Sequence, residues 1–143
     1  MSLYSLLYVS RSLVTGQTAE VAVADIVGTA RQRNAQLGVC GALLFTGARF
    51  AQVLEGARAA VEELMTSINR DPRHADIVII QAGEIPRPRF AKWALAYSGP
   101  SIFVSRTVAR ALDEIARHGT QAKGEGLLKM LEEFPAERPA LVS

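Results

Sequence analysis

The sequence has little of what marks several classes of protein. Cys40 is the only cysteine among 143 residues, so the chain has no intrachain disulfide and no cysteine-based metal cluster. Sixteen basic and fourteen acidic residues give a formal charge of only +2, which does not predict a nucleic-acid partner. No apolar stretch is long enough to cross a bilayer, and the amino terminus lacks a charged leader. We therefore expect a soluble cytoplasmic protein without a metal site that binds neither membrane nor nucleic acid.

What the sequence does contain is the composition of an ordinary globular domain. Apolar residues make up 49% of the chain and charged residues 21%, which is usual for a globular protein that buries a substantial core. The spacing of the apolar residues predicts strands at 3–9, 39–45, 49–55, 76–85 and 89–97, and helices at 18–38, 57–72, 108–115 and 127–134.

The order of these elements predicts the fold class. A β-α-β-β-α-β order with a fifth strand matches an α+β, ferredoxin-like domain whose two main helices lie on one face of the sheet. The first and fourth strands are apolar on both faces, so the other face of the sheet must also be covered. The C-terminal tail helices are the expected cover.

A glutamine in the third strand stands out. Because side chains alternate along a strand, Gln52 shares a face with Phe50 and Leu54, in the middle of an apparently buried row. A buried amide without partners costs about 1–3 kcal/mol. Tyr8 ends a similar row in the first strand, which neighbours the third in a ferredoxin-like sheet. We therefore expect Tyr8 and Gln52 to be cross-strand neighbours.

Two interpretations of these polar residues are open at this point. In the first, Tyr8 and Gln52 form a satisfied internal pair, and Asn34 caps the end of the first helix. In the second, the three side chains converge on a flat polar ligand between the two main helices. The segment after the second helix adds three polar residues at the same end: Asp71, Arg73 and His74. Each of these alone is typical of a solvated helix terminus.

Together these residues carry a resemblance to a known family. The segments are "LLYVS" around Tyr8, "ARQRNAQLGVCG" around Asn34, "FAQVLEG" around Gln52, "INRDPRH", and "PRFAKWAL" around Trp93. In order and spacing they resemble the BLUF family of flavin-binding blue-light sensors, of the short single-domain type, over residues 3 to about 98. The pairing of FxQxLEG with a following DxRH is more specific than either motif alone.

The resemblance implies a cofactor and a role for each residue. FAD, or alternatively FMN or riboflavin, would bind non-covalently with its ring between the two main helices. Tyr8 would donate an electron and a proton under light, and Gln52 would relay the proton and rearrange its hydrogen bonds. Asn34 would bond the carbonyl edge of the ring and Arg73 its pyrimidine side. The implied cofactor-binding residues are Ile26, Asn34, Gln52, Asp71, Arg73 and His74.

The resemblance also implies how the signal leaves the domain. Trp93 and Leu95 would transmit it through the fifth strand and the tail helices. Leu95 stands where family members often have methionine, and leucine lacks the polarizable sulfur. Residues 1–98 would form the flavin-binding domain and residues 99–143 a helical extension packed on the sheet. The tail has no effector signature, so we expect no enzymatic activity and an output through a protein partner or self-association.

Two other functions remain as alternatives. One is a flavin-free, acylphosphatase-type enzyme that uses Arg73 and Asn34 on an anion, although the chain lacks a glycine-rich anion loop before a helix. The other is an adaptor module whose pocket has lost its flavin. The colour of the purified protein, and a reversible red shift under blue light, would separate these functions from a photoreceptor.

Overall fold

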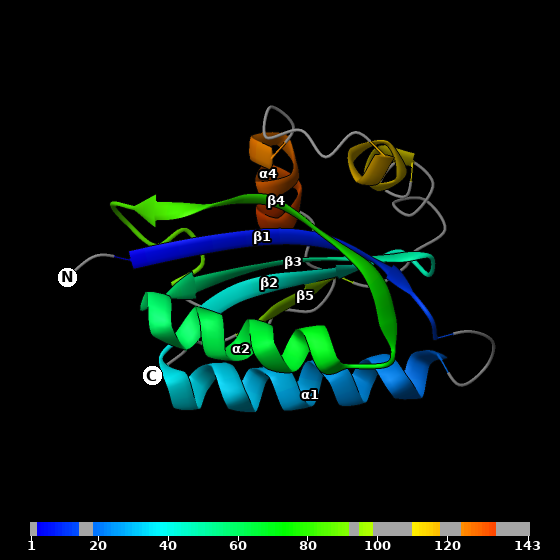
Figure 1. Ribbon diagram of the computed structural model, residues 1–143, viewed down its shortest axis with the longest axis horizontal. Helices are drawn as coiled ribbons and strands as arrows, with labels where there is room; N and C mark the ends of the chain where they lie inside the picture. The colour runs from blue at the N-terminus through cyan, green and yellow to red at the C-terminus, as the bar shows by residue number, and fades with distance from the viewer. Residues whose placement is uncertain (1–2, 15–18, 92–94, 99–109, 118–123, 134–143) are drawn as a thin grey trace.

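The fold is a five-stranded sheet with helices on both faces (Figure 1). The computed structural model describes residues 3–14, 19–91, 95–98, 110–117 and 124–133. The strands follow the order β4-β1-β3-β2-β5, and all neighbours are antiparallel except β2 and β5. They are β1 (Leu3–Ser12), β2 (Cys40–Phe45), β3 (Arg49–Gly56), β4 (His74–Ile85) and β5 (Ala96–Ser98).

The helices lie in two layers that enclose the sheet. Helices α1 (Ala19–Leu37) and α2 (Arg58–Arg70) run side by side along one face, which we call the cavity face (Figure 1). Helix α4 (Gly124–Glu133) lies on the opposite face, which we call the tail face, and a helical segment at 110–117 packs there too. The α+β, ferredoxin-like class predicted from the sequence is confirmed. None of the described helices has both the length and the apolar character needed to cross a membrane.

The register of β1 brings distant parts of the chain together. β1 lies in the interior of the sheet, where Leu3 pairs with Ile85 of β4 and Tyr8 lies opposite Gln52 of β3. The predicted cross-strand placement of Tyr8 and Gln52 is therefore confirmed. Their side chains point to the cavity face, since strand residues directly opposite each other share a face.

Two glycines with positive φ position the elements around this pair. Gly38 (φ 68°) follows α1 and lets the N–H of Val39 donate to the carbonyl oxygen of Asn34 at 2.8 Å, which closes the helix. Gly47 (φ 93°) supplies the turn between β2 and β3. The first glycine thus places Asn34 in the last turn of α1, and the second joins the two strands that flank the site.

The sheet separates apolar cores on its two faces. On the cavity face, one cluster centres on Leu6, Leu54 and Val61, and another on Val27, Leu43, Phe45, Phe50 and Leu95. On the tail face, the sheet residues Leu7, Val9, Val53 and Ile80 pack with Leu112, Ile115, Leu127 and Leu131 of the tail helices. The expectation that the tail helices cover the second face is confirmed.

The fourth strand differs from its prediction, because it lies at the edge of the sheet. The sequence predicts a strand covered on both faces. Ile80 is buried against the tail helices, but Ile79, on the cavity face, is 53% exposed. Helix α2 contacts mainly β1 and β3, and α1 contacts β2, so the helices cover the edge strand only in part, as at Ile77.

The fifth strand is shorter than predicted. The sequence predicts a strand over 89–97, whereas β5 comprises only Ala96–Ser98 and the described residues 89–91 form a turn. The cause is a side chain, since the buried carboxylate of Glu55 accepts the backbone N–H groups of Arg89 and Phe90. These groups are therefore unable to join a strand ladder. Trp93 lies outside the described residues.

Candidate functional site

A cavity opens between α1, α2 and the cavity face of the sheet. Its lining consists of Tyr8, Ile26, Thr29, Ala30, Arg33, Asn34, Leu43, Phe50, Gln52, Leu64, Ser67, Ile68, Asp71, Arg73 and His74. The structure therefore brings Tyr8 and all six expected cofactor-binding residues to one site. Within the described residues, no group of three or more His, Cys, Asp or Glu side chains is arranged to hold a metal.

Tyr8 and Gln52 form a buried polar pair in the floor of this cavity. The Tyr8 hydroxyl donates to Oε1 of Gln52 at 2.5 Å, and the two residues are only 3% and 4% exposed. Burial raises the pKa of Tyr8 well above its usual value, and the nearby charge of Asp71 adds to this rise. The hydroxyl is therefore a protonated donor at neutral pH. The internal pair of the first interpretation is therefore present, and it lies in the wall of a cavity between the two helices.

Asn34 lies at the end of α1 and is 1% exposed. The sequence left open whether it serves as a helix cap. The bond that closes the helix is made by the backbone carbonyl of Asn34, with Gly38 directly after the helix. Asn34 also belongs to the cavity wall. A buried amide in the wall of a cavity is typical of a group that orients a ligand.

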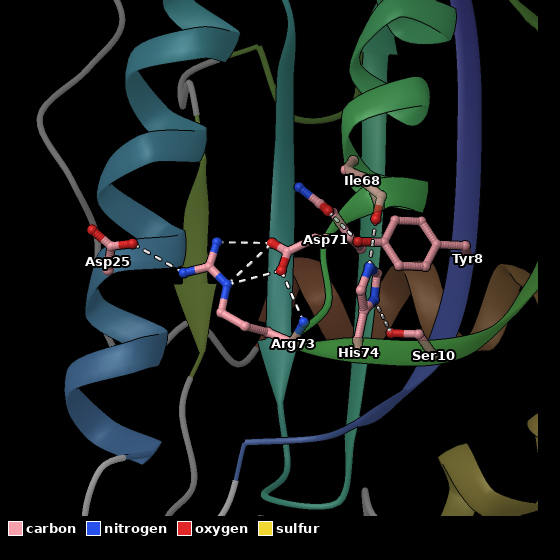
Figure 2. Close-up of polar contacts among 8 residues, drawn as sticks. Tyr8, Ser10, Asp25, Ile68, Asp71, Arg73 and His74 are labelled. Atoms are coloured by element: carbon pink, nitrogen blue, oxygen red, sulfur yellow. Dashed lines mark hydrogen bonds and ion pairs between the residues drawn. The ribbon is translucent and has the colours of Figure 1, made fainter.

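Arg73 is held between two carboxylates from different elements (Figure 2). Its guanidinium donates from Nε and Nη2 to Asp71, at 2.9 and 2.8 Å, and from Nη1 to Asp25 of α1 at 2.9 Å. The Arg73 side chain, which bonds Asp71, lowers the pKa of that carboxyl. Arg73 therefore links α1 to the end of α2 beside the cavity. Sequence reasoning missed Asp25, because no local motif connects it to a residue so distant in the chain.

His74, at the start of β4, contacts both the end of α2 and β1 (Figure 2). Its Nε2 lies 2.7 Å from the carbonyl oxygen of Ile68, which only accepts, so Nε2 carries a proton. Its Nδ1 lies 2.7 Å from the hydroxyl of Ser10, and its ring meets Phe50 edge to face. Both ring nitrogens thus have protein partners. His74 therefore faces the cavity with its ring, and Ser10 is a supporting residue that the sequence motifs did not reveal.

Leu95 lies beside the cavity and not in its lining. It is fully buried in a cluster with Leu43 and Phe50, two residues that do line the cavity. Its carbonyl oxygen accepts from Nε of Arg31 in α1 at 3.1 Å. Leu95 is therefore one residue layer away from the site.

Another contact that the sequence did not predict joins the two helices, since Nη2 of Arg33 in α1 donates to the Ser67 hydroxyl of α2 at 2.7 Å.

The chemistry of the lining fits a flavin ring. Apolar side chains from both helices, including Ile26, Ala30 and Leu64, form the sides of the cavity. Amide and guanidinium groups of Asn34 and Arg73, and the amide of Gln52, supply polar atoms at its margins. A flat heteroaromatic ring with a carbonyl-bearing edge matches this distribution, because its faces require apolar contact and its edge requires hydrogen-bond donors.

Comparison with known proteins agrees with this chemistry. The chain matches the family model of BLUF domains, "Sensors of blue-light using FAD", over residues 3–96. Photoactivated adenylate cyclase subunit beta of Euglena longa is 36% identical over 95 residues, which make up 66% of this chain and 11% of that protein. The chain thus spans only about a tenth of the length of this curated relative.

Solved structures show the same relationship. The dark state of the BLUF protein BlrB is 34% identical, with a TM-score of 0.65 and coverage of 82% of this chain and 83% of that one. The ground state of BlsA superposes with a TM-score of 0.80 over 96% of this chain and 91% of that one, at 24% identity, so this likeness concerns the fold. The family model matches most of the length of the chain, and the cavity of the chain contains the buried Tyr8–Gln52 pair. The chain belongs to the BLUF family of blue-light sensors that use FAD.

Proposed function

We propose that Tyr8 and Gln52 are the photochemical pair of this sensor, and that the flavin ring lies between α1 and α2. The observation that carries this proposal is the 2.5 Å hydrogen bond from Tyr8 to Gln52 in the lining of the cavity. When bound, the flavin supplies absorption of blue light and, once excited, a strong demand for an electron. Tyr8 is an oxidisable ring beside the cavity whose hydroxyl proton already has a defined acceptor.

Gln52 gives the site two arrangements. Its planar head carries an acceptor and a donor, so reversal of the head exchanges the atoms presented to Tyr8 and to the cavity. In a buried site each hydrogen bond is strengthened, so the two arrangements are discrete states. Tyr8 would give up an electron to the excited flavin and its hydroxyl proton to Oε1 of Gln52, while the amide nitrogen of Gln52 would release a proton towards the ring. Return of an electron and a proton to Tyr8 would then leave the amide in the second arrangement. The altered contact with the ring edge would produce the red shift.

Asn34 and Arg73 would orient the ring. Asn34 offers a donor at the carbonyl edge from the last turn of α1, and Arg73 offers its guanidinium at the pyrimidine side. Ile26, Asp71 and His74 would complete the site by apolar contact, by holding Arg73 and by ring packing. The anion-binding enzyme alternative finds no support, because the family model that the chain matches is one of light sensors.

For the output we propose a division at about residue 98. Residues 1–98 would sense light, and residues 99–143 would pass the signal to a separate protein partner or to a second copy, without enzymatic activity of their own. The packing of Leu95 one layer from the cavity supports it as a transmitting residue. Trp93 is proposed beside it from the resemblance alone. FAD is the cofactor that the family description names. The proposed location is the cytoplasm.

The test is optical. The purified protein should be yellow, and blue light should shift its flavin absorption to the red with recovery in the dark. Tyr8→Phe keeps the ring and removes the hydroxyl, so the variant should retain flavin and lose the reversible shift. A normal photocycle in Tyr8→Phe would rule out Tyr8 as the donor. A colourless wild-type protein that takes up no added flavin would rule out the cavity as its site.

A further inference from the structure

Glu55 is a buried charge on the tail face of β3. It follows Gln52 by three positions, and because strand side chains alternate, the two residues point to opposite faces. Glu55 is 4% exposed, although an isolated buried carboxylate is strongly unfavourable. Such a residue is stable only if its surroundings supply hydrogen bonds that are specific to this position.

The partners of Glu55 are backbone groups of the turn that leads towards β5. Its Oε1 accepts the N–H groups of Arg89 and Phe90, both at 2.8 Å, and its Oε2 lies 3.0 Å from the same Arg89 nitrogen. Burial raises the pKa of Glu55, and these two N–H groups act in the opposite direction. Residues 89–90 and Glu55 therefore stabilise each other, since separation would leave a carboxylate buried without a partner.

The side chains of the same two residues hold α4. The guanidinium of Arg89 contacts Glu125 through Nη2 at 2.5 Å and Nη1 at 3.2 Å, and its Nε contacts Glu132. The fully buried ring of Phe90 packs in the same core as Leu127 of α4. A two-residue segment thus bonds β3 with its backbone and α4 with its side chains.

The charge balance makes Arg89 decisive for this contact. Glu55, Glu125 and Glu132 surround its single guanidinium, and Lys129 acts on Glu125. With Arg89 in place each carboxylate has an opposite charge nearby. Without it, Glu132 of α4 and Glu55 of β3 would repel each other with no positive charge between them, and Glu125 would lose its partner.

We propose that Glu55, Arg89 and Phe90, with Glu125 and Glu132, form a clasp through which a change at Gln52 reaches α4. This inference rests on the proposed function, because it assigns the output of the same site. Glu55 acts as a positioning residue on the strand that carries Gln52. The bonds of Glu55 to residues 89 and 90 have ordinary hydrogen-bond lengths, so a shift of β3 away from these residues lengthens them. Light therefore loosens α4 from the tail face.

The test is hydrogen exchange of the flavin-loaded full chain, in the dark and under blue light, with the absorption spectrum of the same samples. In the wild type, amides of residues 124–133 should exchange about fivefold faster in the light. In Arg89→Ala, these amides should exchange at the faster rate already in the dark, with no further change in light and a normal red shift. Arg58→Ala is the control, because Arg58 forms an exposed ion pair with Glu62 on α2; it should behave like the wild type.

A second variant removes the clasp from its other side. Glu125→Gln with Glu132→Gln deletes both ion pairs of Arg89 without leaving facing carboxylates, so it keeps the test open if Arg89→Ala does not fold. It should also raise dark exchange at 124–133 and reduce the light-induced increment. A red shift without any light-induced change at these residues, or a wild-type increment in the folded clasp variants, would overturn the clasp alone. The absence of a red shift in the wild type would overturn the proposed function, and the clasp with it.

Discussion

Gln52 and Glu55 lie on the same strand and are equally buried, yet they have different hydrogen-bond partners on the two faces of β3. On the cavity face, Gln52 is a neutral amide bonded to the hydroxyl of Tyr8, beside a cavity. On the tail face, Glu55 is a carboxylate bonded to two successive backbone N–H groups, near the charges of Arg89 and Glu132.

The difference shows how burial can either allow two states or impose one. An amide can reverse and still offer one donor and one acceptor, so the Gln52 site tolerates two arrangements. A carboxylate offers acceptors only and requires donors, so the Glu55 site has one stable arrangement. The cavity face is thus suited to switching between two hydrogen-bond arrangements, and the tail face to transmitting a displacement of β3.

The largest expected effect is the loss of the red shift when the amide on the cavity face is removed. Gln52→Leu has nearly the same volume and removes both functions of the amide, so the red shift should disappear completely while flavin stays bound. The measurement is the light-minus-dark absorption difference. Glu55→Gln is the matched control on the other face and should keep the full shift. A residual reversible shift in Gln52→Leu would show that the amide is not the switching group.

The next effect concerns cofactor affinity, which only the cavity face should control. Asn34→Ala and Arg73→Ala each remove donors to the ring edge, and bonds of this kind contribute about 1–3 kcal/mol, or roughly a 5- to 150-fold rise in the flavin Kd. Fluorescence titration of the apoprotein measures this directly. Arg89→Ala removes an arginine from the tail face and should leave the Kd unchanged. Equal losses in all three variants would mean that the effect is one of general stability.

A smaller effect is the opposite pH dependence of the two faces. Arg73, through its hydrogen bonds, holds the pKa of Asp71 below its ordinary 3.8, so the stability from this carboxylate is present above that pH and is lost as pH falls through the folded pKa. Burial raises the pKa of Glu55 above its ordinary 4.5, so its contribution is complete below that pH and is lost as pH rises through the folded pKa.

The corresponding variants separate these two slopes. In urea unfolding at a series of pH values, Asp71→Asn should lose less stability than the wild type on acidification. Glu55→Gln should lose less than the wild type as the pH rises from about 4.5 towards neutrality. Parallel pH curves for the wild type and both variants would contradict the assignment of these slopes to the two carboxyl groups.

The smallest expected effect lies between the two faces, at Leu95. Leu95→Met is close to volume-conserving, and such swaps in a core usually change stability by less than about 1.5 kcal/mol. Because Leu95 packs beside the cavity without lining it, the red shift should remain and only the rate of dark recovery should change, by a few fold. Loss of the shift itself in this variant would place residue 95 in direct contact with the switch.

The features predicted from the sequence are those that depend on periodicity. Alternation along two strands and the strand order of the fold were sufficient to place Tyr8 opposite Gln52. The features missed are polar contacts between residues far apart in the chain, such as Asp25 with Arg73 and Ser10 with His74. No spacing rule links such pairs, because their meeting depends on the final position of separate elements.

The predicted fifth strand at 89–97 was too long for the same reason. Strand propensity in "RFAKWAL" is a local property, whereas the turn at 89–91 depends on a carboxylate more than thirty positions earlier in the chain. Glu55 could be seen in the sequence as part of "FAQVLEG", but its hydrogen-bond partners could not be predicted. A charged residue within a strand that is otherwise buried is a signal that something outside the strand must bond it.

The pairing of β1 has a consequence for synthesis on the ribosome. The first strand to emerge lies inside the sheet, yet it pairs only with β3 and β4, and Leu3 finds its partner only when Ile85 has been made. At roughly 5–20 residues per second, the nascent strand waits several seconds with both edges unpaired. The cavity is likewise incomplete until His74 has left the exit tunnel, so β1, β2, β3 and the first residue of β4 must emerge before a flavin can bind.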